Sequence, residues 1–134
     1  MLALEKDLFF SVKMRDTLHY YDIEVKTVRN LSAFEESLEA KDDQKFALAI
    51  INIATIGVDW ETAIRQARIA GLKVLAFGSH MDLQARSKAL EAGARRVVAN
   101  SKFTSDMPAL VQRMLDEPGD ASLNETESEP ESAI

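Results

Sequence analysis

Short apolar runs alternate along this chain with longer stretches of helical pattern, and this alternation limits the possible folds more than any other feature. Strict alternation of strands and helices implies right-handed crossovers, and therefore a parallel sheet with helices on both faces. We predict the α/β class: a doubly wound sheet of five parallel strands in a (βα)5 sandwich of three layers. The runs that predict strands are residues 2–4, 23–28, 46–53, 74–77 and 97–99.

The run over residues 46–53 is apolar at both alternating positions, which is typical of a central strand covered on both sides. The first helix is expected over about residues 8–20. The last helix is expected to begin near residues 104–105 and to accept Pro108 in its first turn.

The helices in between have recognisable ends. Ser32 begins a capping-box pattern, and Asp59 is expected to cap a helix over residues 60–70. Gly71 and Gly93 are expected to end the third and fourth helices, since glycine adopts the left-handed conformation of a helix C-terminus without strain.

A doubly wound sheet binds its ligands at the carboxyl ends of its strands. The residues directly after each strand are therefore the first candidates for a functional site. They are residues 5–7, 52–57, 78–80 and 100–103.

Residues 1 to about 117 resemble the receiver domain of two-component response regulators, a flavodoxin-like fold. The resemblance rests on residues 46–57, in the place of the third strand and the loop of the phosphoacceptor, and on residues 85–94, in the place of the fourth helix. The latter segment ends in the turn Glu91-Ala-Gly-Ala94.

In this family an acidic pair after the first strand binds Mg²⁺ and an aspartate after the third strand accepts a phosphoryl group. A serine or threonine after the fourth strand and a lysine after the fifth contact the phosphoryl oxygens. The reaction needs all four kinds of group: a carboxylate nucleophile, a divalent cation, a hydroxyl and a fixed positive charge.

The resemblance places these positions on residues of other kinds. The degenerate pocket comprises Glu5, Lys6, Asn52, Gly78 followed by Ser79, and Asn100 with Lys102 two residues later. An asparagine amide does not act as a carboxylate nucleophile. One acid has become Lys6, whose ammonium either fills the space of the cation or points to solvent, and a β-bulge would be needed to turn Lys102 towards the pocket.

Ser79, His80 and Asp82 lie within four residues, but this spacing favours capping of the fourth helix over a catalytic triad. His80 either faces a partner or is an ordinary loop histidine. Gly57 and Gly78 belong to no phosphate-binding motif. We therefore expect no catalytic residue, no metal site and no cofactor, and hence no enzyme.

The net charge of −6 is concentrated in residues 118–134, where five acids and no lysine or arginine leave −1 for residues 1–117. Such a segment is expected to be a disordered acidic tail following a domain over residues 1–117. A nearly neutral domain is poorly suited to nucleic acid. The absence of cysteine and of a long apolar run predicts a cytoplasmic protein without a membrane span.

These observations predict a phosphorylation-independent receiver-like module for signal transduction that acts through protein–protein contact. A homodimer through the fourth helix, fifth strand and fifth helix is one possible assembly, and the partner protein is not identified. Candidate contact residues are Trp60, His80, Arg95 and Phe103, although Trp60 also suits core packing. The alternative is a domain that binds a small molecule or an anion in the crevice at the strand ends.

Overall fold

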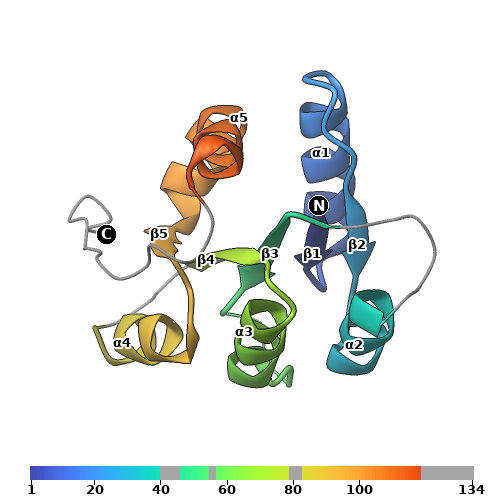
Figure 1. Ribbon diagram of the computed structural model, residues 1–134. Helices are drawn as coiled ribbons and strands as arrows, with labels where there is room; N and C mark the ends of the chain where they lie inside the picture. The colour runs from blue at the N-terminus through green and yellow to red at the C-terminus, as the bar shows by residue number, and fades with distance from the viewer. Residues whose placement is uncertain (40–45, 55–56, 79–82, 119–134) are drawn as a thin grey trace.

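Five parallel strands form one sheet in the computed structural model, which describes residues 1–39, 46–54, 57–78 and 83–118 (Figure 1). The strand order is β2-β1-β3-β4-β5, and every neighbouring pair is parallel. The strands are β1 (Leu2–Leu4), β2 (Lys26–Val28), β3 (Leu48–Asn52), β4 (Lys73–Gly78) and β5 (Arg96–Ala99).

Five helices alternate with these strands and form the outer layers. Figure 1 shows α1 and α5 over one face of the sheet and α2, α3 and α4 over the other. The prediction of a doubly wound five-stranded α/β fold is therefore confirmed. The helices are α1 (Leu8–His19), α2 (Leu31–Glu39), α3 (Trp60–Ile69), α4 (Leu83–Ala92) and α5 (Asn100–Asp116).

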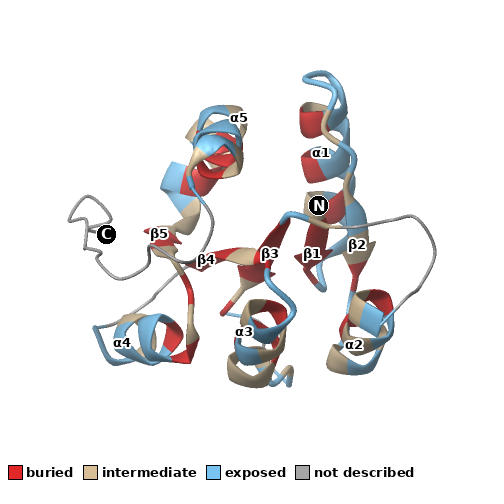
Figure 2. Ribbon diagram, viewed as in Figure 1, coloured by how far each residue is buried: buried red, intermediate tan, exposed pale blue. Residues whose placement is uncertain are grey.

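The core consists of two apolar layers, because alternate residues of each strand point to opposite faces of the sheet. Ile50 and Phe77 are fully buried on the side of α1 and α5, and Ile51 and Ala76 are fully buried on the other side. Figure 2 shows this burial along the strands and on the inner sides of the helices. The central strand β3 is covered on both faces, as its sequence predicts.

Two strands are shorter than their apolar runs. Residues 23–25 do not belong to β2, because Ile23 N–H donates to Leu18 O at 3.0 Å in the turn that closes α1. Within the same turn Asp22 has a positive φ of 65°. At the central strand, hydrogen-bonded pairing begins at Leu48 opposite Lys73, two residues after the predicted start.

The predicted helix ends are right at α3 and wrong at α2. Asp59 accepts a hydrogen bond from Thr62 N–H at 3.1 Å and caps α3. Ser32 lies inside α2, whose first turn is capped instead by Asn30, with Oδ1 2.8 Å from Ala33 N. Gly71 and Gly93, with φ of 92° and 125°, follow α3 and α4 as predicted.

Helix α5 begins at Asn100, four residues before the earliest predicted start. The prediction failed because the helix contains a kink at Asp106, where φ is −118° and ψ is 21°. Pro108 lies two residues after the kink; it has no N–H, and its ring clashes with a carbonyl group of the preceding turn, which disfavours a straight helix there. The proline thus stands in the first turn after the kink.

Within the described residues, no helix is both long and apolar enough to cross a membrane. The predicted acidic tail, residues 118–134, lies outside the described residues except for Pro118.

Candidate functional site

The candidate site lies where the carboxyl ends of β1, β3 and β4 meet at one edge of the sheet. Glu5 follows β1 directly, Asn52 is the last residue of β3, and Gly78 is the last residue of β4. Parallel pairing places Leu4 opposite Ile51 and Asn52 opposite Phe77, so these strand ends are level with one another. The fold thus brings together residues that are separated by up to 73 positions in the sequence.

Glu5 and Asn52 form the central contact of this edge. The amide Nδ2 of Asn52 donates to Glu5 Oε1 at 2.9 Å. The second carboxylate oxygen, Oε2, accepts from the backbone N–H of Asp7 at 3.0 Å. Glu5 is only 3% exposed, so these two donors replace the water that a free carboxylate would bind.

Asn52 also shapes the loop that follows its own strand. Its Oδ1 accepts a hydrogen bond from Ala54 N–H at 2.8 Å, which is the geometry of an Asx turn. The side chain therefore uses its donor on Glu5 and its acceptor on the loop, so an amide satisfies both neighbours. An aspartate at the same place offers only acceptors when it is ionised.

Lys6 is exposed and reaches across to the loop after β3. A Cβ atom built on Gly57 would lie 3.9 Å from Lys6 Nζ, which places the ammonium beside that glycine. The carbonyl oxygen of Lys6 accepts from Arg29 Nε at 3.2 Å. The ammonium of Lys6 thus lies beside Gly57, and whether it fills the space of a cation beside Glu5 stays a prediction. Arg29 is a neighbour that the sequence did not indicate.

Gly78 is packed tightly against the loop after β3. A Cβ atom there would lie 3.2 Å from Ala54 N and 3.3 Å from Ala54 Cβ, closer than most Cβ contacts in proteins. The residue itself is buried. The position that the resemblance assigns to a hydroxyl group is therefore occupied by the loop after β3.

Asn100 and Lys102 stand in the first turn of α5, and no bulge separates them from β5. Lys102 is about half exposed, and its Nζ lies 3.3 Å from Asp106 Oδ2 on the same helix. The suggestion that Lys102 turns back into the pocket is thus not supported, because its ammonium is paired along α5.

Four residues were predicted as contact residues, and the structure shows a different environment for each of the three that it describes. Phe103 is fully buried and stacks on Phe77 with ring centroids 4.3 Å apart, so its prediction as a surface contact is wrong. Trp60 is partly buried against the core on the side of α2, α3 and α4. Arg95 is engaged by Glu117 at 3.0 Å.

Ser79 and His80, like Asp82, fall outside the described residues, so their predicted roles stay predictions. The residues that the sequence analysis missed altogether belong to the opposite edge of the sheet. Lys73 and Glu117 form polar contacts there. No local sequence motif indicates these contacts, because their partners lie more than twenty positions away.

The described part of the chain contains no group of three or more His, Cys, Asp or Glu residues arranged to hold a metal ion. At the candidate site one carboxylate, Glu5, faces an amide rather than a second acid. A hard divalent cation prefers several oxygen ligands, which this pair does not supply. The geometry supports a rigid, internally satisfied polar contact.

No protein-family model matches the sequence, and no curated protein matches it significantly. Solved structures do match. A CheY-like receiver domain from Methanospirillum hungatei is 18% identical with a TM-score of 0.75, covering 86% of this chain and 91% of its own. A response regulator from Thermotoga maritima is 14% identical with a TM-score of 0.74, covering 87% and 96%.

A response regulator from Burkholderia pseudomallei, which contains a phosphorylated aspartic acid and a calcium ion, is 14% identical with a TM-score of 0.64 and covers 87% and 74%. These likenesses extend over most of this chain, and they agree with its strand order and its alternating helices. The chain therefore has the CheY-like, flavodoxin-like fold of response regulator receiver domains.

Proposed function

We propose that this chain is a receiver-like signalling module whose state is not set by phosphorylation of an aspartate. The observation that carries the proposal is the contact between Asn52 and Glu5, at 2.9 Å, at the carboxyl edge of the sheet. In a receiver domain this edge holds the phosphoacceptor and its cation. Here the equivalent place is filled by an amide whose donor and acceptor are both used within the chain.

The surrounding residues support the same conclusion. Phosphoryl transfer to a carboxylate needs a nucleophilic oxygen, a cation and groups that neutralise the developing charge. Asn52 lacks the nucleophile, and Gly78 has no hydroxyl and packs tightly on Ala54. Lys102, the basic residue closest to the expected lysine position, is paired with Asp106. The module consequently works without acyl-phosphate chemistry and is not an enzyme.

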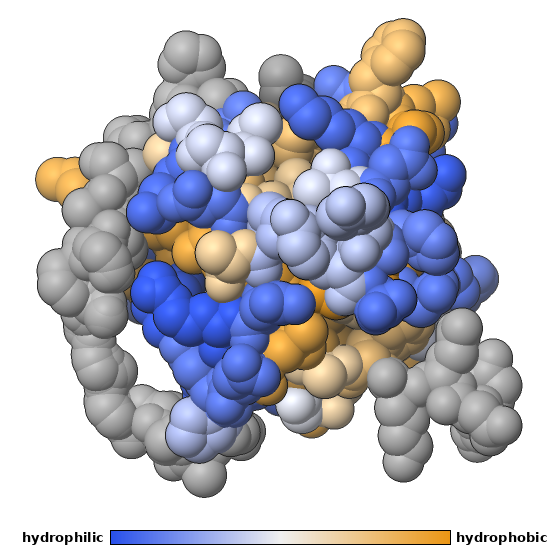
Figure 3. Space-filling model, turned by 90° about the horizontal axis from the view of Figure 1, so that it is seen from above, coloured by the Kyte–Doolittle hydropathy of each residue, from blue (hydrophilic) through white to orange (hydrophobic). Residues whose placement is uncertain are grey.

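The output of the module is contact with another protein in the cytoplasm. Exposed apolar side chains support this part of the proposal, because sizeable apolar patches on soluble proteins commonly mark interaction sites. Leu8, Phe9 and Val12 of α1 are 58%, 91% and 45% exposed. Figure 3, which views the molecule from the side of α1 and α5, shows hydrophobic side chains gathered at one edge among hydrophilic ones.

A homodimer through α4, β5 and α5 remains part of the proposal. Leu83 and Leu90 of α4 are 83% and 38% exposed and lie seven residues apart, so they share one side of the helix. Light scattering of the wild type and of Leu83→Glu tests this assembly. Loss of a dimer in the variant supports it, and a monomeric wild type at high concentration contradicts it.

Incubation with acetyl phosphate and Mg²⁺, followed by intact-mass measurement, tests the absence of phosphorylation. We expect no increase in mass and no Mg²⁺-dependent change in Tm, because the nucleophile and the second acid are absent. The Burkholderia pseudomallei regulator, which carries a phosphorylated aspartic acid, is a suitable positive control. A stable adduct with the mass of one phosphoryl group on this chain would contradict the proposal.

Binding of an anion is the second candidate function, and one observation favours it. The ammonium of Lys6 lies beside Gly57, and Arg29 Nε donates to the backbone carbonyl of Lys6, so two cationic residues contact the segment directly after β1. A thermal-shift screen of anionic metabolites distinguishes the two functions. Stabilisation that disappears in Lys6→Met favours anion binding, whereas an unchanged Tm across the screen favours the signalling module.

A further inference from the structure

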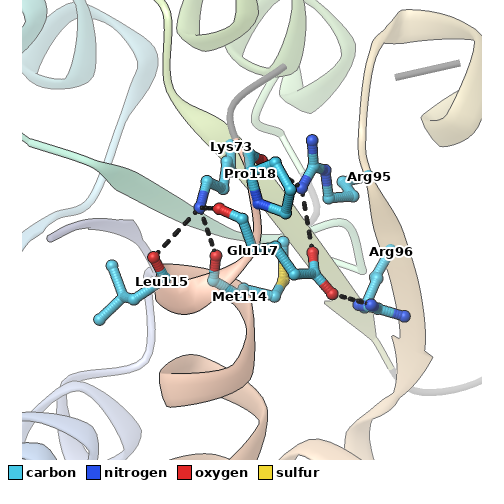
Figure 4. A network of polar contacts seen from close by, with 7 residues as sticks. All are labelled: Lys73, Arg95, Arg96, Met114, Leu115, Glu117 and Pro118. Atoms are coloured by element: carbon cyan, nitrogen blue, oxygen red, sulfur yellow. Dashed lines mark hydrogen bonds and ion pairs between the residues drawn. The ribbon is translucent and has the colours of Figure 1, made fainter. Parts of the chain in front are cut away.

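The C-terminal end of α5 is held on the sheet by four charged residues at the edge opposite the candidate site. We name them the C-terminal clasp: Lys73 at the start of β4, Arg95 directly before β5, Arg96 at its start, and Glu117 directly after α5. Figure 4 shows their side chains converging around the last turn of the helix.

Lys73 binds backbone carbonyl groups at the C-terminal end of α5. Its Nζ donates to Met114 O at 2.6 Å, to Leu115 O at 3.2 Å and to Glu117 O. The last carbonyl groups of an α-helix have no acceptor role within the helix and carry partial negative charge, so a cation stabilises them. Lys73 thus caps α5 from a different element of the fold.

Glu117 lies between two guanidinium groups. Its Oε1 is 3.0 Å from Arg95 Nη1, and its Oε2 contacts Arg96 Nη2. Arg95 Nη1 also donates to Pro118 O at 3.0 Å. The side chains of Arg95, Arg96 and Glu117 are only 17–20% exposed, so water screens these contacts less than those of a surface ion pair.

The rest of α5 is held in a different way. Phe103, Met107 and Met114 are at most 1% exposed and pack in the apolar layer between α5 and the sheet. After Met114, Leu115 is partly buried and Asp116 and Pro118 are exposed. Leu115 still packs partly on this apolar layer. Beyond Met114 the attachment of the chain therefore depends less on apolar packing and more on charge and hydrogen bonding.

We propose that the C-terminal clasp is a releasable device that determines whether residues 115–118 lie bound on the sheet or free of it. When the clasp opens, the apolar part of α5 keeps the helix in place while its last turn detaches. The strongly acidic residues 119–134 follow directly in sequence. The inference does not depend on the proposed function, because it concerns the other edge of the sheet.

The charges around Glu117 keep the clasp closed near neutral pH. Desolvation raises the pKa of Glu117, but hydrogen bonds and attraction from Arg96 and Arg95 together lower it below its usual value of 4.5. The pKa of Lys73 is lowered mainly by desolvation and also by repulsion from Arg95, while attraction from Glu117 and Asp116 raises it. Opening near neutral pH therefore needs competition for the arginines, by salt or by an acidic partner, and not protonation.

Hydrogen exchange of the backbone amides of residues 115–117 tests the proposal in the full chain. Glu117→Gln keeps the size of the side chain but removes its charge, and charge-assisted hydrogen bonds are about twice as strong as neutral ones. We expect these amides to exchange about five to ten times faster in the variant. The amides around Phe103 are expected to keep their wild-type rates.

Glu91→Gln is the matched control, since Glu91 is an exposed acid on α4 outside the clasp. Lys73→Met, which removes the cap of the last carbonyl groups, is expected to speed exchange at the same amides. Raising the salt concentration is expected to speed it in the wild type and to have less effect in Glu117→Gln. Wild-type exchange rates at residues 115–117 in both Glu117→Gln and Lys73→Met would overturn the proposal, as would equal acceleration throughout α5.

Discussion

Replacing Asn52 with aspartate tests the central contact of the candidate site. The change puts two carboxylates at the 2.9 Å now spanned by the hydrogen bond from Asn52 to Glu5. Two unit charges at that distance repel by about 6 kcal/mol at an effective dielectric constant near 20. Uptake of one proton removes this repulsion, and at pH 7 it costs about 4 kcal/mol for a carboxyl group with a pKa near 4. Because proton uptake costs less than the repulsion, the folded variant is expected to take up a proton. Asn52→Asp is therefore expected to destabilise the protein by about 4 kcal/mol at pH 7.

The loss depends on pH with a definite sign. A carboxyl pair that holds a proton in the folded state has a pKa raised above that of the unfolded chain. The stability of such a pair is complete below the unfolded pKa and falls as the pH rises towards the folded pKa. The difference between wild type and Asn52→Asp is therefore expected to be small at pH 4. It should grow by about 1.4 kcal/mol per pH unit above that, as measured by urea unfolding at several pH values.

Two variants make this measurement specific. Asn30→Asp is the matched control, because Asn30 caps α2 through an oxygen that aspartate retains, and we expect almost no loss of stability. The double variant Glu5→Gln with Asn52→Asp restores one amide facing one carboxylate and is expected to recover most of the stability. Equal stability of Asn52→Asp and wild type at pH 7, or an unchanged loss from pH 4 to pH 7, would refute the assignment of Asn52 as the partner of Glu5.

Three further predictions concern packing and charge. Gly78→Ser is expected to lower the free energy of unfolding by about 1–3 kcal/mol, because its Cβ would meet Ala54; an unchanged urea midpoint would show that the loop after β3 moves freely. Phe103→Ala is expected to cost about 3–5 kcal/mol and Phe9→Ala almost nothing, since the first ring is buried and the second is 91% exposed; similar losses would contradict this burial. Glu117, whose pKa is lowered in the folded state, contributes stability above the unfolded pKa that is lost as the pH falls through the folded pKa. The stability gap between wild type and Glu117→Gln should therefore shrink as the pH falls from neutral into the acidic range, and a gap that does not shrink would argue against the clasp.

The architecture follows from the sequence to the level of strand number, strand direction and the two helical layers. Apolar runs of the right length and glycines at 71 and 93 are local signals, and local signals suffice for alternating elements. Local signals did not predict the boundaries of β2 and α5, because these depend on contacts and geometry in the folded chain. Ile23 is apolar but belongs to a turn through its hydrogen bond to Leu18, and Pro108 acts through a kink rather than at a helix start.

The candidate site was predictable in part. Because parallel strands end at one edge, Glu5 and Asn52 were expected to lie near each other, and the structure brings them into contact. The tight packing of Gly78 on Ala54 could not be foreseen, since it depends on the path of a loop. The burial of Phe103 was also missed, because residues 100–103 were expected to form a loop after β5. In the structure Phe103 belongs to α5 and faces the sheet.

The amino-acid sequence by itself determined the α/β fold class of this protein. Apolar periodicity and the residues that begin or end helices are short-range signals, and five alternating strand–helix units leave few possible arrangements of a sheet. That position 52 holds an asparagine and not an acid is likewise read directly from the sequence. Only the tertiary structure decided which polar groups satisfy one another. The amide of Asn52 with Glu5, and Lys73 with the end of α5, join atoms 47 and 41 positions apart, and contacts over such separations arise from packing that no local pattern encodes.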